Sequence, residues 1–521
     1  MYVHTIAFFI LTFVSLVFLP SCTRQPYDTL TVLAGSELED LKPMLEQIQA
    51  NTGVALEMQY SGTLDGAERL TAGEEVDLAW FSHGKYLSLL QGTSKRILAQ
   101  EKIMLSPVLL GVKERKARAW GWLDKTNITW NDIATKAGAG ELRYAMANPP
   151  SSNSGFTALV GVVAALSNNS EEFDISKANQ TQIRAFFKGQ KLTAGSSGWL
   201  ADRYIQEQEQ LDGLVNYESV LLQLNASGKL KEKLFLVYPR EGIITADYPL
   251  MLFNEEKRAA YERLVTYLRS PEFQQLIVER TQRRSVLPTL ALPAQSSKQA
   301  LVELPFPRDL ETIDHVLFSY LDEQRIPSHP FFVLDISGSM KGGRLADLKA
   351  AMNSLTGEDR SLTGQFARFR NRERITILTF NDQVEDTPQF STEVVAEREH
   401  NMVTIRDFIG SLQADGGTAI FSALDRTYGL IAQAYRQDPS RYYSVVLLTD
   451  GENTEGEPME QFISQYAALP EEIKRVKTFT ILFGNAKKAE VERIAELTGG
   501  RTFDSRKKSL SEIFKTIRGY Q

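Results

Sequence analysis

Five oxygen-bearing side chains follow apolar or glycine-rich segments in the last third of the chain. Asp335, Ser337 and Ser339 alternate in DISGS, which continues the apolar run FFVL. Thr418 ends the segment DGGT, and Asp450 follows VVLLT. Carboxylate and hydroxyl oxygens are ligands of hard divalent cations such as Mg²⁺, Mn²⁺ or Ca²⁺, and they do not suit zinc or copper. The five residues therefore predict a divalent-cation site, with Mg²⁺ as the expected ion.

The elements around these residues alternate between strand and helix. Strands are expected at 331–334, 374–380, 443–449 and 478–483, and helices at 345–355, 404–412, 420–428 and 489–497. This alternation predicts an α/β doubly wound sheet, in which ligands gather at the carboxyl ends of the strands. Asp335 and Asp450 fall at two such ends, and Gly338 relieves the tight turn. Two carboxylates roughly neutralise a divalent ion, so an Asp or Glu of another protein can complete its coordination shell.

DISGS, GGT and TDG, in this order, resemble the metal-ion-dependent adhesion site of von Willebrand factor A domains. The closing segment TILFGNAKKAEVERIAELTGGRTFDS is similar to the last strand and helix of bacterial members. The resemblance covers residues 328–521 and implies a Rossmann-like domain that binds protein ligands through a bridging cation. It also implies that Ser337, Ser339 and Thr418 are direct ligands, while Asp335 and Asp450 bind directly or through water. The alternative is a domain that keeps the fold without the ion, in which the two aspartates only cap loops.

The front part of the chain, residues 28–295, also alternates strands and helices. Strands are expected at 30–33, 54–60, 76–81, 144–148 and 234–238, and helices at 38–51 and 156–166. The segments LAGSELEDL, NPPSSNSGF and VYPREG with the later DYPL resemble bacterial extracellular solute-binding proteins of the two-lobed, type 2 periplasmic kind. The resemblance implies two lobes, a cleft between them and two or three crossing segments that act as a hinge. Residues 296–327 are expected to be a linker, with a connecting helix near 312–322.

Hydroxyl side chains of the front part are the candidates for lining this cleft: Ser36, Ser61, Thr63, Ser151, Ser152, Ser154 and Ser197. At helix N-termini, hydroxyl and backbone donors suit an anion, but the same residues also serve as ordinary N-caps. Glu37, Glu39 and Asp40 crowd the first turn of the first helix, where they would repel an anion. A neutral or cationic small molecule, or none, is therefore expected at that end.

The N-terminus contains an uncharged apolar run, Ile6–Leu19. A membrane span needs about 20 apolar residues, so this run is short for one and suits the core of a signal peptide. Leu19-Pro20-Ser21-Cys22 resembles a bacterial lipobox, although Pro20 is unusual there and residues 1–5 carry no Lys or Arg. We expect a signal peptide at 1–22, lipidation of Cys22, and a place in the cell envelope, anchored by lipid and facing the periplasm or the outside. The alternative is an uncleaved anchor with a chance cysteine.

Composition and missing motifs exclude several functions. The chain has 521 residues and a net charge of −7, so nucleic acid is not an expected partner. Cys22 is its one cysteine, and its five histidines are scattered without metal-ligand spacing. No nucleophile–base pair, zinc-ligand helix or phosphate-binding loop with its lysine occurs, so no enzyme is expected. The sequence thus predicts an envelope-anchored protein that docks a protein partner through the cation and carries a solute-binding-like module. The alternative is the solute receptor of a transport system, with the A domain as an accessory docking module.

Overall fold

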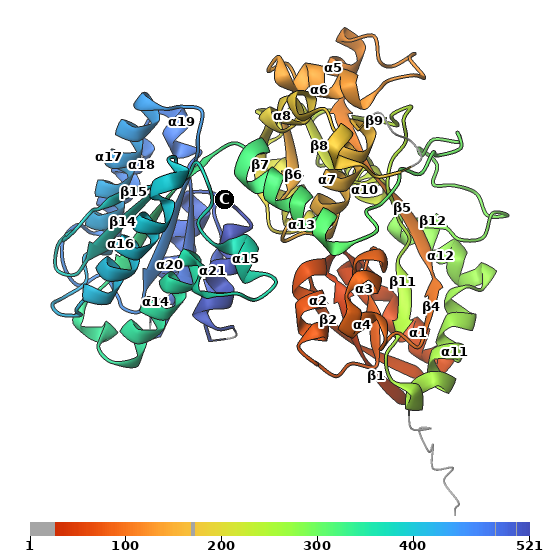
Figure 1. Cartoon of the computed structure of the whole chain (residues 1–521), viewed down its shortest axis with the longest axis horizontal. Coiled ribbons are helices and arrows are strands. Elements are labelled where there is room, and N and C mark those ends of the chain that lie inside the picture. The colour runs from red at the N-terminus through yellow and green to blue at the C-terminus, as the bar shows by residue number, and fades with distance from the viewer. Residues whose placement is uncertain (1–26, 168–171, 485, 507) are drawn as a thin grey trace, which may run out of the picture.

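The protein is described here by a computed structural model that covers residues 27–167, 172–484, 486–506 and 508–521. The predicted signal peptide, residues 1–22, and the predicted lipidation site Cys22 lie outside the described residues. The described chain forms two lobes that pack together and a third unit beside them (Figure 1). Among the described residues, no helix combines the length and the apolar character needed to cross a membrane.

Lobe 1 is built on a five-stranded sheet in the order β2-β1-β3-β11-β4. Its strands are β1 (Asp28–Gly35), β2 (Val54–Ser61), β3 (Leu78–Trp80), β4 (Ala99–Lys102) and β11 (Pro249–Leu252). β1 pairs in parallel with β2 and β3, whereas β11 runs antiparallel to β3 and β4. Its helices are α1 (Leu45–Thr52), α2 (Thr63–Thr71), α3 (Lys85–Leu89), α4 (Gln91–Ser94), α11 (Arg258–Leu268) and α12 (Pro271–Thr281).

The first predicted helix differs from the structure. Residues Ser36–Met44 form a 3₁₀ helix, and only Leu45–Thr52 are α-helical. Pro43 lies inside the first segment and has no N–H to donate to a carbonyl one turn back, which accounts for the tighter winding before it. Leu38, Leu41 and Ile48 are nevertheless fully buried, as their spacing predicts.

Lobe 2 contains a sheet in the order β10-β5-β8-β6-β7, with β9 and β12 also paired to β5. Its strands are β5 (Met104–Lys113), β6 (Tyr144–Ala147), β7 (Gln190–Ala194), β8 (Gly213–Tyr217), β9 (Leu234–Val237), β10 (Thr245–Ala246) and β12 (Arg284–Ser285). Its helices are α5 (Glu114–Ala119), α6 (Trp130–Gly138), α7 (Asn153–Ala165), α8 (Gln180–Lys188), α9 (Ser197–Glu207) and α10 (Glu218–Ala226). Every residue of α7 is buried, because the helix is apolar all round.

The chain crosses between the lobes at three places. β4 of lobe 1 leads directly into β5 of lobe 2, and β10 returns the chain to β11. After α11 and α12, β12 pairs with the start of β5. These crossings agree with the two-lobed fold that the resemblance implies.

The third unit is a six-stranded sheet in the order β15-β14-β13-β16-β17-β18. Its strands are β13 (Ser328–Asp335), β14 (Arg374–Phe380), β15 (Gln389–Ser391), β16 (Tyr442–Thr449), β17 (Lys477–Leu482) and β18 (Thr502–Asp504). All neighbours are parallel except the edge pair β14–β15. The helices are α14 (Gly343–Asn353), α15 (Gly364–Ala367), α16 (Arg398–Ser411), α17 (Ile420–Gln437), α18 (Met459–Ala467), α19 (Glu471–Lys474), α20 (Lys488–Leu497) and α21 (Leu510–Arg518). The predicted doubly wound fold is confirmed.

Helices cover both faces of this sheet because its strands are apolar on both sides. On β13, Phe331 and Val333 pack on one face with residues of α17 and α18. Phe332 and Leu334 point to the other face, into a cluster with α14, α16 and α21. That second cluster continues into the core of the two lobes, so the apolar interior of the third unit is joined to theirs.

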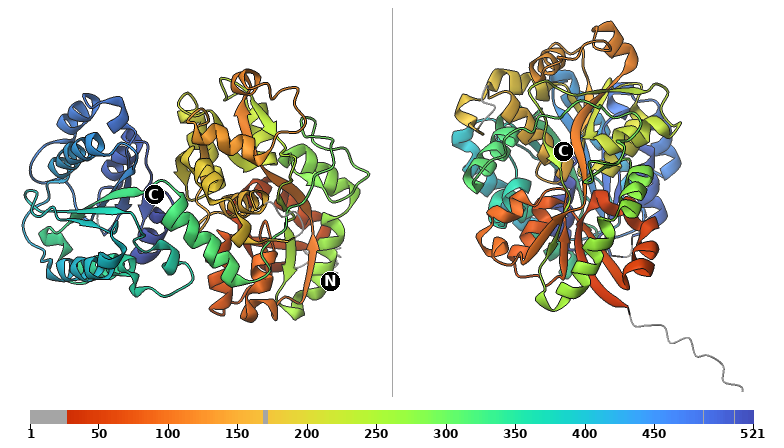
Figure 2. Two further views of the ribbon diagram at one scale, coloured as in Figure 1. Left: turned by 45° about the horizontal axis from the view of Figure 1, so that its top comes forward. Right: turned by 90° about the vertical axis from the view of Figure 1, so that its right-hand side faces the viewer.

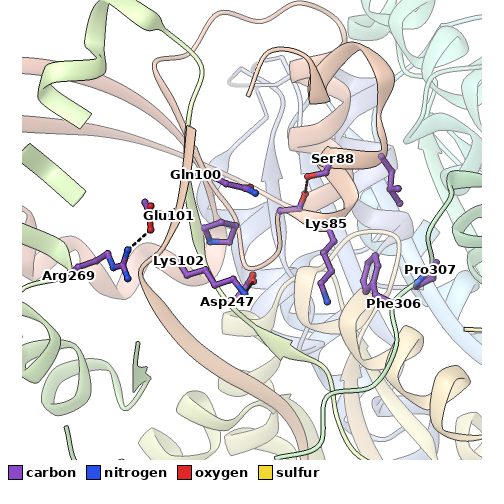
Figure 3. A pocket seen from close by; sticks show the side chains of 12 residues that line it. Lys85, Ser88, Gln100, Glu101, Lys102, Asp247, Arg269, Phe306 and Pro307 are labelled. Carbon is purple, nitrogen blue, oxygen red and sulfur yellow. Dashed lines mark hydrogen bonds and ion pairs between the residues drawn. The ribbon is translucent and has the colours of Figure 1, made fainter. Parts of the chain in front are cut away.

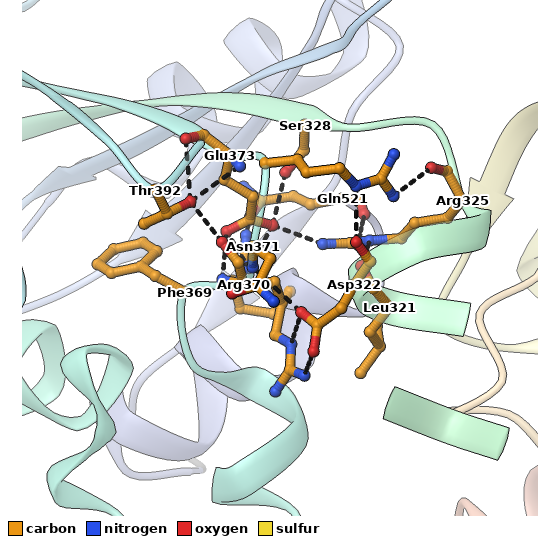
Figure 4. Close-up of polar contacts among 12 residues, drawn as sticks. Leu321, Asp322, Arg325, Ser328, Phe369, Arg370, Asn371, Glu373, Thr392 and Gln521 are labelled. Atoms are coloured by element: carbon orange, nitrogen blue, oxygen red, sulfur yellow. Dashed lines mark hydrogen bonds and ion pairs between the residues drawn. The ribbon is translucent and has the colours of Figure 1, made fainter. Parts of the chain in front are cut away.

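The segment between the lobes and β13 is partly helical. α13 (Leu310–Ser319) and a π-helical turn, Tyr320–Gln324, bury Val316, Leu317 and Tyr320. Directly after the turn, a polar cluster joins this segment to the amino ends of β13 and β14 (Figure 4). Arg325 of the segment and Arg518 of α21 both bond the buried carboxylate of Glu373, just before β14.

The third unit also touches both lobes directly, and α21 lies near the boundary between them (Figures 1 and 2). Lys477 of β17 forms a 2.8 Å ion pair with Glu207 of α9 in lobe 2. The Thr363 N–H donates to Glu68 of α2 in lobe 1 at 2.7 Å. Tyr520 packs edge-on against Trp199 of lobe 2, with ring centroids 4.8 Å apart.

Candidate metal centre

The candidate cation ligands lie between β13 and β16 of the third sheet, the two strands from which the chain continues toward opposite edges of the sheet. β13 and β16 are adjacent and parallel, with Leu334 opposite Leu448. The chain continues from β13 to β14 on one side, and from β16 to β17 on the other. Crevices at the carboxyl ends of such strands are the usual ligand sites of open α/β sheets. Asp335 ends β13 and Asp450 follows β16, so both carboxylates flank this crevice.

Asp335 is fully buried, and its two oxygens have different partners. One accepts the Ser337 N–H at 2.8 Å, and the other accepts the Thr449 hydroxyl at 2.7 Å. Burial raises the pKa of Asp335; the hydrogen bonds from Ser337 and Thr449 oppose the increase, whereas the charge of Asp450 adds to it. A buried carboxylate beside a second one is stabilised by a cation between them.

The two serines join the aspartates through their hydroxyl groups. The Ser337 and Ser339 oxygens lie 3.0 Å apart, and the Ser339 hydroxyl donates to Asp450 at 2.6 Å. Ser337 is fully buried, whereas Ser339 is exposed. The row of oxygens therefore extends from the interior of the domain to its solvent-exposed surface.

Thr418 is brought to the same place by contacts between loops. The Gly338 N–H donates to the Gly416 carbonyl at 2.9 Å, which fixes the loop 415–418 against the DISGS turn. A Cβ added to Gly451 would lie 3.4 Å from the Thr418 hydroxyl and 3.6 Å from that of Ser339. Both hydroxyls thus flank the glycine that follows Asp450. The structure brings all five predicted residues together.

Two further residues belong to this site. Arg344, at the start of α14, forms an ion pair with Asp450 and donates to the Ser339 carbonyl at 3.3 Å. Thr449 holds Asp335, as described above. Thr449 directly precedes Asp450, so its place in the sequence was a usable signal. Arg344 lies five residues beyond Ser339 on a different element, and nothing in its spacing indicated the contact.

The donor set fits a hard divalent cation. All five side chains offer oxygen. Hydrogen bonds of 2.6–3.0 Å join the oxygens of Ser337, Ser339 and Asp450, and the Thr418 hydroxyl lies beside Ser339 at Gly451. Across the described part of the chain, no group of three or more His, Cys, Asp or Glu side chains forms a separate metal site. Asp335, Ser337, Ser339, Thr418 and Asp450 are thus the residues that would hold an ion.

The candidate cleft serines have mostly local partners. The Ser61 hydroxyl, in lobe 1, bonds Asp65 at 2.5 Å and the Gly62 carbonyl at 3.0 Å. In lobe 2, Ser152 bonds Ser154 at 3.2 Å, and Ser151 donates to the Asn148 carbonyl at 3.3 Å. Ser152 occupies the N-cap position of α7 but its side chain makes no capping bond, so ordinary N-capping does not explain it.

The other three candidates stand at the starts of three different helices. Ser197 is buried in the first turn of α9, and its carbonyl accepts from Asn216 at 3.2 Å. Ser36 is half-buried at the start of the 3₁₀ helix. The side chain of Thr63 lies outside what the structure describes. The segments that carry these candidates meet at the boundary between the lobes, where a Cβ on Gly62, which stands between Ser61 and Thr63, would lie 2.5 Å from the Ser151 carbonyl.

A cavity of about 720 Å³ lies at the edge of lobe 1, beside the crossing segments (Figure 3). None of the candidate serines lines it. Its wall carries Lys102 paired with Asp247 at 3.0 Å, Arg269 paired with Glu101, and Lys85 above the ring of Phe306. No sequence motif indicates this cavity, because its residues come from five separate segments.

Comparison with known families assigns the two parts of the chain. Residues 30–280 match the family described as bacterial extracellular solute-binding protein, and residues 331–516 match the von Willebrand factor type A domain. The chain therefore carries a solute-binding domain and a von Willebrand factor A domain.

Curated relatives match only a short part of their length. The inter-alpha-trypsin inhibitor heavy chain H4 of Sus scrofa is 27% identical over 135 residues, which cover 25% of this chain and 13% of that protein. An uncharacterized protein of Synechocystis sp. is 30% identical over 137 residues, covering 26% of this chain and 28% of its own. The chain thus spans less than a third of either relative.

Two solved structures are similar in part. The periplasmic binding protein AfuA of Actinobacillus pleuropneumoniae, with fructose-6-phosphate bound, is 14% identical with a TM-score of 0.44; the match covers 57% of this chain and 98% of that one. A von Willebrand factor type A structure from Catenulispora acidiphila is 17% identical with a TM-score of 0.30; the match covers 38% of this chain and 43% of that one.

Proposed function

We propose that this chain, a solute-binding domain followed by a von Willebrand factor A domain, docks a protein partner through a divalent cation held by the A domain. Asp335, Ser337, Ser339, Thr418 and Asp450 would hold the ion, most simply Mg²⁺. An Asp or Glu of the partner would complete its coordination shell. The solute-binding domain would present the A domain and sense or present a ligand.

The convergence of five oxygen ligands from three loops is the observation that carries this proposal. Two of them are carboxylates, which roughly neutralise the ion, and the others are neutral hydroxyls. A divalent cation that is coordinated by few negatively charged ligands still attracts an incoming carboxylate strongly. Ser339 is exposed, so the partner can approach from solvent.

We propose binding rather than catalysis at this site. A bound cation supplies electrostatic attraction and could also activate water. Hydrolysis would further need a base beside the ion. Arg344, which contacts Asp450, is a permanent cation that cannot accept a proton at neutral pH. The nearby carboxylate of Asp382 accepts the Gly417 N–H and so holds the loop of Thr418.

The place of the protein is part of the same proposal. A signal peptide at residues 1–22 and a lipid on Cys22 would anchor the chain to a bacterial envelope membrane, facing the periplasm or the outside. Cys22→Ala would then move the protein from the membrane fraction to the soluble fraction. A variant that remains in the membrane fraction would show that the apolar run itself is the anchor.

Partner binding tests the docking role. The purified protein is immobilised and exposed to envelope extract of its source cell in Mg²⁺ or in EDTA, beside Asp335→Ala and the control Asp407→Ala on α16. We expect specific partners to be retained by the wild type and the control in Mg²⁺ only, and to be lost from Asp335→Ala. Retention by Asp335→Ala, or in EDTA, would rule out docking through the cation.

A second candidate function, reception of a small solute for transport, is favoured by the 720 Å³ cavity of the solute-binding domain. A ligand present at 100 times its dissociation constant stabilises the folded state by about 2.7 kcal/mol. A thermal-shift screen of small solutes would therefore reveal a tight ligand. No shift with any solute would leave the domain as a platform for the A domain.

A further inference from the structure

The N-terminus of α7 lies at the boundary between the lobes and lacks a cap of its own. The N-cap residue Ser152 makes no side-chain bond to the helix, and the first turn contains no acidic residue. The first N–H groups of any helix need acceptors, and its N-terminal end favours a negative charge. Because α7 is buried along its whole length, a helix end of this kind calls for a partner from elsewhere in the fold.

Glu37 of lobe 1 supplies a carboxylate to this turn. The side-chain amide of Asn153, the first residue of α7, donates to both Glu37 oxygens at 2.9 and 3.0 Å. The two residues are 116 positions apart and belong to different lobes. This contact is therefore a direct bond across the cleft.

The local structure of lobe 1 is shaped to hold Glu37 in this pose. Its carboxylate folds back over Gly35, where a Cβ would lie 2.5 Å from the nearest Glu37 oxygen, so a larger residue at 35 would push the carboxylate out of this pose. Arg283, almost fully buried, donates to the Glu37 carbonyl at 3.0 Å and pairs with Asp40 at 2.6 Å. These contacts anchor the 3₁₀ helix that carries Glu37.

The two lobes also touch beside this bond. A Cβ added to Gly62 of lobe 1 would lie 2.5 Å from the Ser151 carbonyl of lobe 2. A Cβ on Gly519, just after α21, would lie 2.7 Å from the Ser151 hydroxyl. Ser151 is thus enclosed by lobe 1 and by the C-terminal end of the A domain, and the lobes are in close contact around the carboxylate.

We propose that Glu37 is a built-in carboxylate ligand that latches the two lobes shut without any bound solute. Glu37 is half-buried at this contact. Burial raises its pKa, and the hydrogen bond from Asn153 opposes the increase. The closed domain then forms a fixed support for the A domain. A solute that enters this cleft has to displace Glu37 from Asn153.

Chemical rescue tests the latch on the full chain. Glu37→Ala removes one CH₂–COO⁻ unit, and acetate has the same size and charge. We expect Glu37→Ala to lower the thermal midpoint by about 3–6 °C and to increase the radius of gyration measured by X-ray scattering. Acetate should reverse both changes saturably, whereas chloride at equal ionic strength should not. Glu39→Ala is the matched control, because Glu39 lies two residues away and is exposed.

Two results would overturn the latch. The first is a Glu37→Ala protein with the midpoint and radius of gyration of the wild type. The second is an acetate effect of equal size in Glu37→Ala and Glu39→Ala. If Glu37→Ala does not fold, Glu37→Gln keeps the shape and loses the charge; it should show a larger radius of gyration and no response to acetate, and an unchanged radius would contradict the latch. None of these measurements depends on the cation site.

Discussion

At the scale of single residues, the proposed binding of an ion depends on the balance of charge around Asp450. Asp450 is 1% exposed and is paired on one side with the Arg344 guanidinium. Gly484 lets this guanidinium approach closely, since a Cβ there would lie 2.9 Å from the Arg344 Cζ. A permanent positive charge at this distance repels a second cation. Arg344 therefore weakens the binding of the ion while it holds Asp450 in place.

Arg344→Ala should bind Mg²⁺ about tenfold more tightly than the wild type, because the repulsion between the guanidinium and the ion is lost. Isothermal titration calorimetry measures the affinity directly. Arg426→Ala, an exposed arginine of α17 in the same domain, makes the same change of net charge and should bind as the wild type does. Weaker binding by Arg344→Ala would mean that the arginine serves mainly to orient Asp450.

The five candidate ligands could be predicted from the sequence, because each follows an apolar strand or a glycine-rich turn. Thr449 could have been added, because it directly precedes Asp450. The contact of Arg344 with Asp450 could not be predicted, because it forms only when α14 is packed beside β16. The hydroxyl residues of the front domain stand at helix starts, as predicted, and Ser61 and Ser152 bond close neighbours in the sequence. The contact of Glu37 across the cleft could not be predicted, because it forms only when the two lobes pack together.

At the scale of elements, one buried carboxylate, that of Glu373, joins the amino ends of strands in the third sheet to their surroundings. Glu373 is fully buried and accepts bonds from Arg518 at 2.8 Å, from Ser328 at 2.7 Å and from Arg325. These partners belong to α21, to β13 and to the segment that leads from the lobes (Figure 4). Despite its burial, the two arginines lower the pKa of Glu373 to about 2. The cluster lies about 23 Å from Asp335, at the other end of β13.

Glu373→Gln should lower the free energy of unfolding by about 3–5 kcal/mol at pH 7, since it leaves two buried arginines without their counter-charge. The folded pKa is below the ordinary value of 4.5, so the carboxylate contributes its full stability above pH 4.5 and loses it as the pH falls toward 2. Chemical denaturation of the wild type and of Glu373→Gln measures the free energy of unfolding at each pH. The difference between the two proteins should become smaller as the pH falls from 4.5 toward 2.

Glu399→Gln serves as the control for this experiment, because the Glu399 side chain is 85% exposed beside Arg406. Its effect should remain within about 0.5 kcal/mol at every pH. A difference between Glu373→Gln and the wild type that does not change with pH would contradict the assigned role of the Glu373 charge.

At the scale of the whole molecule, the A domain is fixed to the solute-binding domain on one side and presents the cation site on another. The Lys477–Glu207 pair, the Thr363–Glu68 bond and the packing of Tyr520 on Trp199 join it to both lobes. The fold of each domain could be predicted from the alternation of strands and helices. This interface could not, because Lys477 and Glu207 stand on elements that the strand and helix patterns assign to separate domains.

Lys477→Met keeps most of the side-chain volume but removes the charge that pairs with the half-buried Glu207. We expect the A domain to separate partly from lobe 2, with a larger radius of gyration in X-ray scattering. Glu207 keeps its ion pair with Arg203 at 2.6 Å in this variant, so the change reports the loss of the Lys477 charge alone. Lys488→Met, an exposed lysine of α20, should scatter as the wild type does. An unchanged radius of gyration in Lys477→Met would mean that the pair does not hold the interface.

The central claim is that the A domain binds a divalent cation through side chains of three loops, and a titration of the full chain with Mg²⁺ tests it most directly. Thr418→Ala removes one hydroxyl ligand, and Thr404→Ala, whose hydroxyl bonds the His400 carbonyl of its own helix, is the control. Calorimetry should show one ion bound per wild-type chain, the same affinity for Thr404→Ala, and at least about tenfold weaker binding for Thr418→Ala. A wild type that binds no ion, or a Thr418→Ala variant that binds it equally well, would contradict the account.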